Sequence, residues 1–240
     1  MDRFAGKQRA RGMGATVIAV GMVTRDDVEA AAARTRHVVR HTPLTLVEPG
    51  VFPGTVMLKL EQLQHTGSYA VRGVFNHVIH ALERQTFDPD AGLAAAYTPS
   101  IASAVVHAAR RLGIPATLFL PVGASVDAEV LDDSCGPLPE GTPAGEIMLV
   151  RVDGSVADAR IEAQRHATTS GALHCAGLGA EGWPEMVAGA GTVGLELWTQ
   201  TLGQLDTVVV PDRARALAAG VAAALAGHVR VVEADGGRVD

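Results

Sequence analysis

The twenty residues Met57–Asn76 constrain the fold of this chain more than any other stretch. A short apolar run, Val56–Leu60, gives way to polar residues and a Thr66–Gly67–Ser68 turn. A helical period of apolar residues follows at Val71, Val74, Phe75, Val78, Ile79 and Leu82. This order predicts a strand, a tight loop and a helix that opens at Ser68. The loop side chains would then lie at the carboxyl end of a strand, where open α/β sheets keep their ligand sites.

The rest of the chain alternates between predicted helices and strands. Thr24 is expected to cap a first helix, which Thr42–Pro43–Leu44 ends. Further helices are predicted over 100–112, 155–169, 191–201 and 214–225, and strands over 93–97, 116–120, 146–152, 172–175, 207–210 and 229–233. The Gly/Pro-rich segment Cys135–Gly145 is typical of a surface loop. Such alternation predicts a mostly parallel sheet with helices on both faces.

Composition limits the possible functions. The 240 residues are 48% apolar and 19% charged, which is globular and enough for one large domain or two intimate lobes. A net charge of −6 without a Lys/Arg stripe argues against nucleic-acid binding. No run reaches transmembrane length, so no membrane partner is expected. Cys135 and Cys175 lack metal-ligand spacing and suit a reducing, cytoplasmic setting.

The N-terminal residues 1–23 form a separate extension. Lys7, Arg9 and Arg11 precede the apolar run Ala15–Val23, which superficially imitates a signal peptide. The run is short, contains glycine and has no small-residue cleavage site. An extra strand, or an extension upstream of a natural start near Met22, fits the pattern better.

The segment Met57–Asn76 resembles the threonine dehydratase and serine racemase branch of the fold type II pyridoxal-phosphate (PLP) enzymes. That branch carries the signature LKLE-x-LQ-x-TGSFK-x-RGA-x-N. Matching residues are Leu58, Lys59, Leu60, Glu61, Leu63, Gln64, Thr66, Gly67, Ser68, Arg72, Gly73 and Asn76. Residues 26–44, 107–124 and 188–198 are also similar to the family.

The resemblance implies an α/β fold of two lobes, each with an open, mostly parallel sheet flanked by helices, and C-terminally truncated. Residues 24–76 and 153–240 would form the large lobe, and residues 77–152 the small lobe.

The departure with the largest consequence is at the family's Schiff-base lysine, which falls on Ala70. A PLP enzyme of this kind holds its cofactor as an imine to that lysine and moves protons with the same amine. Alanine does neither. The only other lysines are Lys59, within the predicted strand, and Lys7. We expect neither to take over the role.

Three further parts of the family's site are altered. The loop S-x-G-N-H falls on residues 97–101, so that Ser100 replaces the asparagine beside the cofactor ring and Pro99 has no N–H to donate. The glycine-rich phosphate cup falls on residues 213–217, where Cβ atoms crowd the backbone. The sequence reaches Asp240 before any counterpart of the residue that faces the pyridine nitrogen. We therefore expect a pseudoenzyme without a PLP cofactor and without a metal.

Candidate residues of the remaining cleft fall into two groups. Candidates for acid–base catalysis are Tyr97, His65 and Tyr69. Candidates for substrate binding are Ser68, Arg72, Ser100, Asp212, Arg213 and Arg215, with the arginines suited to a carboxylate or phosphate. The alternative is that these residues are packing and surface substitutions, and that Glu61 and Arg72 keep a structural ion pair.

Two weaker patterns also stand out. The adjacent His174 and Cys175 would point to opposite sides of a strand rather than form a nucleophilic pair. The glycines between Gly189 and Gly194 could open a helix and bind an anion there.

Three functions remain open. The first is a PLP-independent enzyme that uses acid–base catalysis for cyclisation, elimination or condensation of an anionic, amino-acid-derived small molecule. The second is a non-catalytic subunit that stabilises or regulates a partner enzyme. The third, more remote, is an active PLP-dependent ammonia-lyase. In each case we expect a homodimer or a hetero-oligomer with a related enzyme.

Overall fold

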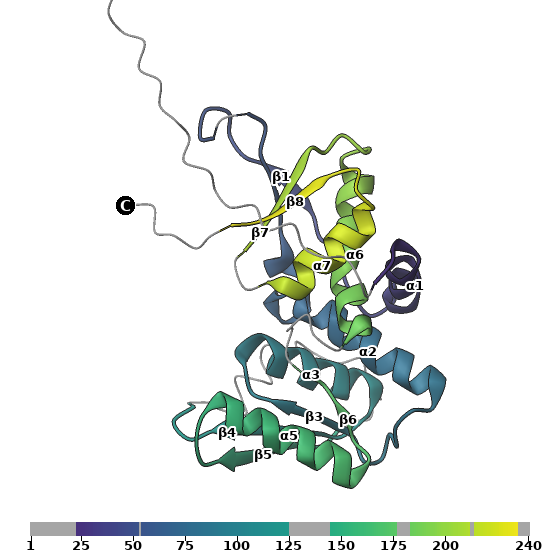
Figure 1. The fold of residues 1–240 in the computed structure, drawn as a ribbon, viewed down its shortest axis with the longest axis vertical. Coiled ribbons are helices and arrows are strands. Elements are labelled where there is room, and N and C mark those ends of the chain that lie inside the picture. Colours follow the sequence, from purple (N-terminus) through teal and green to yellow (C-terminus); the bar gives the residue numbers. More distant parts are fainter. Residues whose placement is uncertain (1–22, 53, 125–144, 177–182, 212–213, 235–240) are drawn as a thin grey trace, which may run out of the picture.

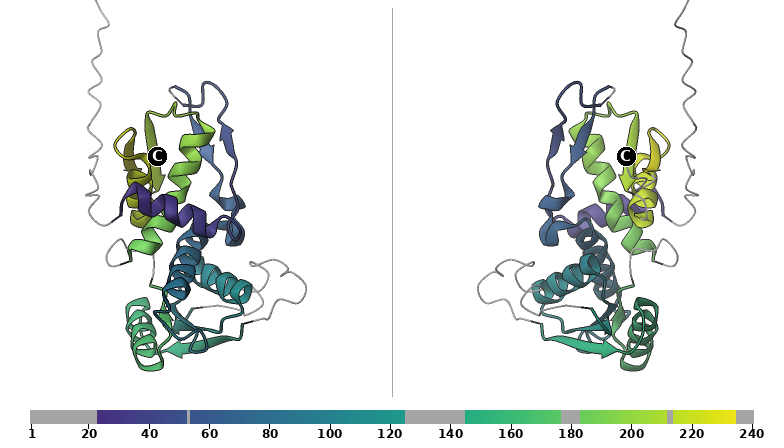
Figure 2. Two further views of the ribbon diagram at one scale, coloured as in Figure 1. Left: turned by 90° about the vertical axis from the view of Figure 1, so that its right-hand side faces the viewer. Right: turned by 90° about the vertical axis from the view of Figure 1, so that its left-hand side faces the viewer.

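The computed structural model describes residues 23–52, 54–124, 145–176, 183–211 and 214–234. They form two lobes joined along helix α2 (Ala70–Arg84), one lobe above and one below in Figure 1. The lower lobe holds a sheet between helices. The upper lobe holds two separate strand pairs beside a group of helices, as the side views in Figure 2 also show.

The lower lobe is built on a four-stranded parallel sheet in the order β5-β4-β3-β6. Its strands are β3 (Leu93–Ala96), β4 (Ala116–Pro121), β5 (Ile147–Val152) and β6 (Leu173–His174). Helix α3 (Pro99–Leu112), with α2 packed against it, covers one face, and α5 (Val156–Ser170) covers the other. Since α5 and β6 belong with this sheet, the lobe includes residues 153–174, which the sequence analysis assigned to the large lobe.

The upper lobe contains α1 (Arg25–Thr35), α6 (Pro184–Gln200) and α7 (Arg215–Leu225) around the first half of α2. Its strands are β1 (Leu44–Leu46) with β2 (Met57–Lys59), which pair antiparallel, and β7 (Thr207–Pro211) with β8 (Arg230–Ala234), which pair parallel. Two 3-10 turns, η1 (Glu61–Leu63) and η2 (His65–Gly67), join β2 to α2. Among the described residues, the two strand pairs are not hydrogen-bonded to each other.

Helix packing in the upper lobe depends on glycines. A Cβ atom on Gly189 of α6 would lie 2.8 Å from the Cα atom of Gly73 in α2. A Cβ atom on Gly191 would lie 2.6 Å from the carbonyl oxygen of Gly220 in α7. Both approaches are closer than real Cβ contacts, so glycine lets α2, α6 and α7 touch through their backbones. The anion site suggested for Gly189–Gly194 is wrong, because α6 begins at Pro184 and these residues lie inside it.

The predicted α/β class, with mostly parallel sheets flanked by helices, is confirmed. Thr24 caps α1 through a reciprocal pair of hydrogen bonds with Asp27. Helix α2 begins at Ala70 rather than Ser68, because Thr66 and Gly67 adopt positive φ angles and Ser68 is extended. No helix in the described ranges is long and apolar enough to cross a membrane.

Candidate functional site

The loop between β2 and α2 is held by its own polar side chains. The Gln64 amide accepts hydrogen bonds from the backbone N–H groups of Arg40 and His65 and donates one to the Arg40 carbonyl at 2.7 Å. The Ser68 Oγ accepts a hydrogen bond from the Ala70 N–H at 3.2 Å. These contacts tie the loop to the segment after α1 and place Ala70 in the first turn of α2.

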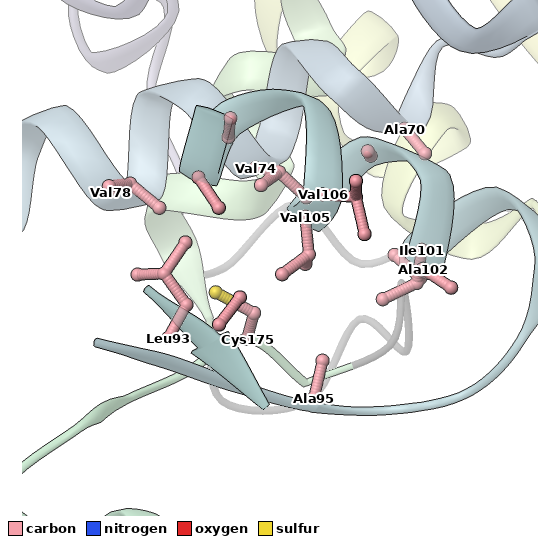
Figure 3. Close-up of a cluster of buried hydrophobic side chains, with 14 of the residues drawn as sticks. Ala70, Val74, Val78, Leu93, Ala95, Ile101, Ala102, Val105, Val106 and Cys175 are labelled. Carbon is pink, nitrogen blue, oxygen red and sulfur yellow. The ribbon is translucent and has the colours of Figure 1, made fainter. Parts of the chain in front are cut away.

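Ala70 is completely buried in the main apolar cluster of the lower lobe. The same cluster includes Ile101 and Ala102 of α3 and the thiol of Cys175, and Figure 3 shows these side chains between the helices and the sheet. Burial raises the pKa of Cys175 to about 12, so the thiol stays protonated at neutral pH. The His174–Cys175 pair therefore offers no activated nucleophile.

An ion-pair network fills the junction of β2, α2 and α6. The fully buried Arg72 guanidinium donates to Glu61 at 2.9 Å and to Glu196 at 2.7 Å, with further bonds to Thr42, Thr192 and the Arg40 carbonyl. Burial alone would lower the Arg72 pKa, but the two carboxylates raise it. All five N–H groups of the guanidinium have partners in the protein, which fits a structural role.

Lys59 belongs to the same network. Its ammonium donates to the Thr42 carbonyl at 2.7 Å, to Glu196 at 2.5 Å and to the Gln200 amide oxygen at 2.9 Å. An ammonium has three hydrogens, and each has an acceptor here. Burial lowers the Lys59 pKa, although the Glu196 carboxylate opposes that shift.

The three candidate catalytic side chains lie in different surroundings. Tyr69 packs against the apolar cluster of α6 and α7, and burial raises its pKa. Tyr97 follows β3 and packs against the cluster that contains Ala70. The His65 ring stacks on His107 of α3, with ring centroids 4.7 Å apart. Within the described residues, no hydrogen bond joins any two of these three candidates.

His65 is in the neutral form, which can accept a proton. Its pKa is lowered by burial and by the nearby Arg40 and Arg111 guanidinium groups, so the imidazole is neutral at pH 7. Two cationic side chains beside a neutral imidazole could receive an anion. That arrangement is the feature of this loop best suited to chemistry.

The remaining substrate-binding candidates do not converge. Ser100 lies in the first turn of α3 behind Pro99 and is half-buried. Arg215 is exposed as the first residue of α7, whose end has no side-chain cap. Asp212 and Arg213 lie outside the described residues. No group of three or more potential metal ligands occurs in the described part of the chain.

A large groove opens in the upper lobe instead. The β2–β7 groove has a volume of about 730 Å³. Residues 55–59, containing β2, form one wall, and residues 204–211, containing β7, form the other. Its lining also includes Leu44, Glu61, Tyr69, Val193, Leu197, Thr201, Leu217 and Val221. Sequence reasoning missed this groove, because no pattern in a sequence tells how far apart two strand pairs lie.

Comparison with known proteins gives the relatives of the chain. Residues 35–238 match the family model described as pyridoxal-phosphate dependent enzyme. L-threonine ammonia-lyase of Thermotoga maritima is 32% identical over 207 residues, which cover 85% of this chain and 47% of that protein. The catabolic L-threonine dehydratase TdcB of Staphylococcus aureus is 28% identical over 207 residues, covering 85% of this chain and 55% of that protein. The chain thus spans about half the length of these curated relatives.

Solved structures of a serine racemase and a threonine deaminase are also similar to this chain. Maize serine racemase superposes with a TM-score of 0.73 at 25% identity, covering 90% of this chain and 62% of that one. The threonine deaminase of T.th. superposes with a TM-score of 0.67 at 26% identity, covering 88% of this chain and 65% of that one.

Proposed function

The chain belongs to the pyridoxal-phosphate dependent enzyme family, and we propose that it is a member without PLP chemistry, acting as a non-catalytic subunit that binds a partner protein. The proposal has two parts. One is that the residues at the position of the family's lysine do not fit the cofactor. The other is that the β2–β7 groove, which carries the assignment, offers a mainly apolar surface to a partner protein.

The residues present do not fit an imine-bound cofactor. The methyl group of Ala70 is buried among alkyl side chains and supplies no amine. Lys59 is the one lysine in the described ranges, and its three ammonium hydrogens are bound within the Glu196 network. Releasing it would leave Glu196 partly unpaired in a buried site, which costs several kcal/mol. We derive no catalytic step through PLP for this chain.

The start of α7 is also poorly suited to a phosphate. In the position where the resemblance places a glycine-rich cup, Ala214 and Ala216 are buried and carry Cβ atoms, and Arg215 points to solvent. A backbone approach to phosphate needs the space that glycine leaves. Arginine could still attract an anion to the surface, but not into a closed cup.

A single observation carries the subunit assignment: the β2–β7 groove is lined mainly by apolar residues. Leu58 is 50% exposed and Val209 is 61% exposed, one on each wall, and the cavity between the walls measures about 730 Å³. Apolar surface of this kind marks an interaction site. The region that matches covers 47% of the Thermotoga maritima protein and 62% of the maize serine racemase, so these relatives are longer than this chain.

A second candidate is a PLP-independent acid–base enzyme. The observation that favours it is His65, a neutral imidazole stacked on His107 with Arg40 and Arg111 close enough to lower its pKa. An anionic, amino-acid-derived substrate would be held by the arginines while His65 removes a proton. In the described part of the chain, Tyr69 and Tyr97 have no hydrogen bond to His65, so this candidate lacks a paired acid.

The first experiment is a titration of the purified chain with PLP, followed by absorbance spectroscopy and calorimetry, with L-threonine and L-serine turnover measured in parallel. We expect no imine band, no saturable binding and no ammonia release. An imine band together with turnover would restore the ammonia-lyase assignment.

The subunit assignment has a separate test. The chain is mixed with the most similar full-length family member from the same organism, and the mass of the mixture is measured by sedimentation. We expect a complex of both chains and a change in the thermal stability or the activity of that enzyme. If the two chains sediment independently and the enzyme is unaffected, this partner is wrong. Activity of the isolated chain that disappears in His65→Asn would favour the acid–base enzyme.

A further inference from the structure

We propose that a polar pocket between α1, α2 and the start of α6 binds a small zwitterion, a molecule that carries an ammonium group and a carboxylate a few atoms apart. This α1–α2–α6 pocket has a volume of about 100 Å³. A cavity of that size holds several water molecules or one molecule of a few heavy atoms. The pocket shares no lining residue with the β2–β7 groove, so its ligand is independent of the proposed subunit function.

Helical spacing brings the polar side chains of the pocket together. Asp27 and Arg34 lie two turns apart, so they share one side of α1. Asn76 and His80 are four residues apart and share one side of α2. Glu185 comes from the first turn of α6. Because the three helices pack against one another, these side chains converge on one space.

The Arg34 guanidinium is the positive half of the pocket. Only 17% of its side chain is exposed. Its Nε atom donates to Glu83 at 2.8 Å, and its Nη1 atom donates to the Asn76 amide oxygen at 2.6 Å. A guanidinium has five N–H donors, and no other described residue accepts a hydrogen bond from Arg34. The remaining donors, including both on Nη2, are suited to the two oxygens of a carboxylate.

Two carboxylates form the negative half. Glu185 lies 3.4 Å from the Nδ1 atom of His80, which is longer than a normal charge-assisted hydrogen bond. Asp27 uses its Oδ2 atom to cap α1 at Thr24, and no described residue donates to its Oδ1 atom. The hydrogen bonds from Thr24 lower the Asp27 pKa, so this carboxylate is ionised at neutral pH. An ammonium group, with three donors, can bond to both residues at once.

Opposite charges around one pocket select a ligand that carries both. A simple anion would be attracted by Arg34 but repelled by Asp27 and Glu185, and a simple cation would meet the reverse. In the part of the chain that the structure describes, no group of three or more potential metal ligands occurs, so a metal ion does not fit either. The lining also includes Ala30 and Ala188, which leave room only for a short hydrocarbon portion.

Glu185 connects the pocket to the contact between the two lobes. Its other carboxylate oxygen lies 4.0 Å from the Nδ1 atom of His77 in α2. Trp183, two residues before Glu185, lies edge-on to His77 and to His174 of β6, with ring centroids 5.1 Å and 5.6 Å apart. An ammonium group bound to Glu185 would compete with His77 and His80 for the carboxylate. Ligand binding should therefore change the surroundings of Trp183.

The test is a titration of the full chain with glycine at constant ionic strength. Asn76 is the only asparagine in the sequence, so selective isotope labelling of asparagine gives one side-chain amide signal in NMR, from inside the pocket. We expect this signal, and the fluorescence of Trp183 in a Trp198→Phe background, to shift saturably in the millimolar range. Acetate and methylammonium each carry one of the two charges and should bind at least about 10-fold more weakly than glycine.

Two variants each remove one charge from the pocket. Arg34→Gln and Glu185→Gln should each weaken glycine binding at least about 10-fold, because each loses charged hydrogen bonds to the ligand. Arg36→Gln removes an exposed arginine that does not line the pocket and should bind glycine as the parent protein does. Circular dichroism verifies that the variants fold. If Arg34→Gln does not fold, Glu185→Gln and the comparison of glycine with acetate still decide the question.

Each outcome supports or overturns the site. Saturable glycine binding that is weakened in both pocket variants but not in Arg36→Gln supports it. No saturable shift of the Asn76 signal overturns it, and the pocket then holds only water. Acetate or methylammonium binding as tightly as glycine overturns the zwitterion. Glycine binding that neither pocket variant weakens assigns the ligand to another part of the chain and overturns the site as well.

Discussion

At the scale of single residues, the substitution Ala70→Lys tests whether position 70 still opens onto a site. Because Ala70 is buried among alkyl groups, a lysine ammonium there would lose its hydration, and its pKa would fall. A depressed lysine pKa costs stability at every pH below about 10.4 and costs nothing above it. We expect the Lys variant to be at least about 2 kcal/mol less stable than Ala70→Met at pH 7.

The matched Met variant has a side chain of similar length without the charge, so the difference between the two isolates the ammonium. Urea denaturation at pH 7 and pH 10 measures the difference in stability between the Lys and Met variants, which should be smaller at pH 10. Equal stability at pH 7 would mean that the lysine reaches water. In that case Ala70→Lys would be the variant to titrate with PLP.

Arg72 gives a second prediction at this scale. Replacing it with methionine leaves Glu61 and Glu196 without their main partner, although Glu196 keeps Lys59. Breaking a buried ion pair from one side costs about 3–5 kcal/mol. Chemical denaturation of Arg72→Met should show a loss of that size. Arg165→Met removes the exposed ion pair with Glu162 and should be as stable as the parent protein. A similar loss of stability in both variants would contradict the structural role of Arg72.

The sequence predicted well where local pattern decides the structure. Most helices and strands lie close to their predicted ranges, since apolar period and caps such as Thr24 act locally. The exceptions include α1, which ends at Thr35 rather than near Thr42, and β1, which was not predicted. The loss of the family's lysine at position 70 could be predicted from the resemblance alone. Two contacts could not be predicted: the stacking of His65 on His107 and the ion pair of Lys59 with Glu196. Both join residues far apart in the chain. The site roles of Ser68, Ser100 and Arg215 stay predictions.

At the scale of elements, the largest difference is the start of α6. The predicted helix began at Gly191, whereas α6 begins at Pro184, seven residues earlier. Glycine lowers helix propensity, so the segment before Gly191 reads as a loop. Contact with α2 and α7 overrides that preference, because the missing Cβ atoms let helices approach where alanine could not.

This packing predicts that a Gly→Ala substitution in α6 destabilises the protein, whereas the same substitution in an exposed helix stabilises it. In an exposed helix, Gly→Ala stabilises by about 0.5–1 kcal/mol. In α6, Gly189→Ala would bring a Cβ atom within 2.8 Å of the Gly73 Cα atom, so it should destabilise by about 1–3 kcal/mol. Thermal and urea denaturation measure the change. Thr199→Ala, on the exposed side of the same helix, should be neutral or slightly stabilising. A stabilised Gly189→Ala would mean that α2 and α6 can separate without cost.

At the scale of the whole molecule, the two lobes meet around His77. This histidine of α2 is buried, contacts the His174 carbonyl of β6 at 3.2 Å and lies edge-on to Trp183 before α6. Its Nδ1 atom is 4.0 Å from the Glu185 carboxylate, which His80 also faces at 3.4 Å. Elements of both lobes therefore surround one titratable ring.

The surroundings of His77 predict how the stability of the protein depends on pH. Burial lowers its pKa more than the His174 carbonyl and Glu185 raise it, so the folded state holds the neutral ring. An unfolded chain binds the proton at about pH 6.5. Stability from the neutral ring is therefore full above pH 6.5 and falls as the pH drops below it, by at most about 1.4 kcal/mol per pH unit for this one group. The carboxylates whose pKa is lowered, Glu196 among them, lose their contribution only in more acidic solution.

Urea denaturation at pH 7.5, 6.5 and 5.5 measures how steeply stability falls with pH. The variant His77→Gln isolates the contribution of His77 to that fall. Glutamine keeps a hydrogen-bond donor for the His174 carbonyl but does not titrate, so the variant should lose stability less steeply between pH 6.5 and pH 5.5. His65 and His174, whose pKa values are also lowered by burial, would supply the remaining slope. An unchanged slope in His77→Gln would place the proton-sensitive step outside the junction of the lobes. A flattened slope would mean that acid loosens the contact between α2, β6 and α6 before it disturbs the carboxylates.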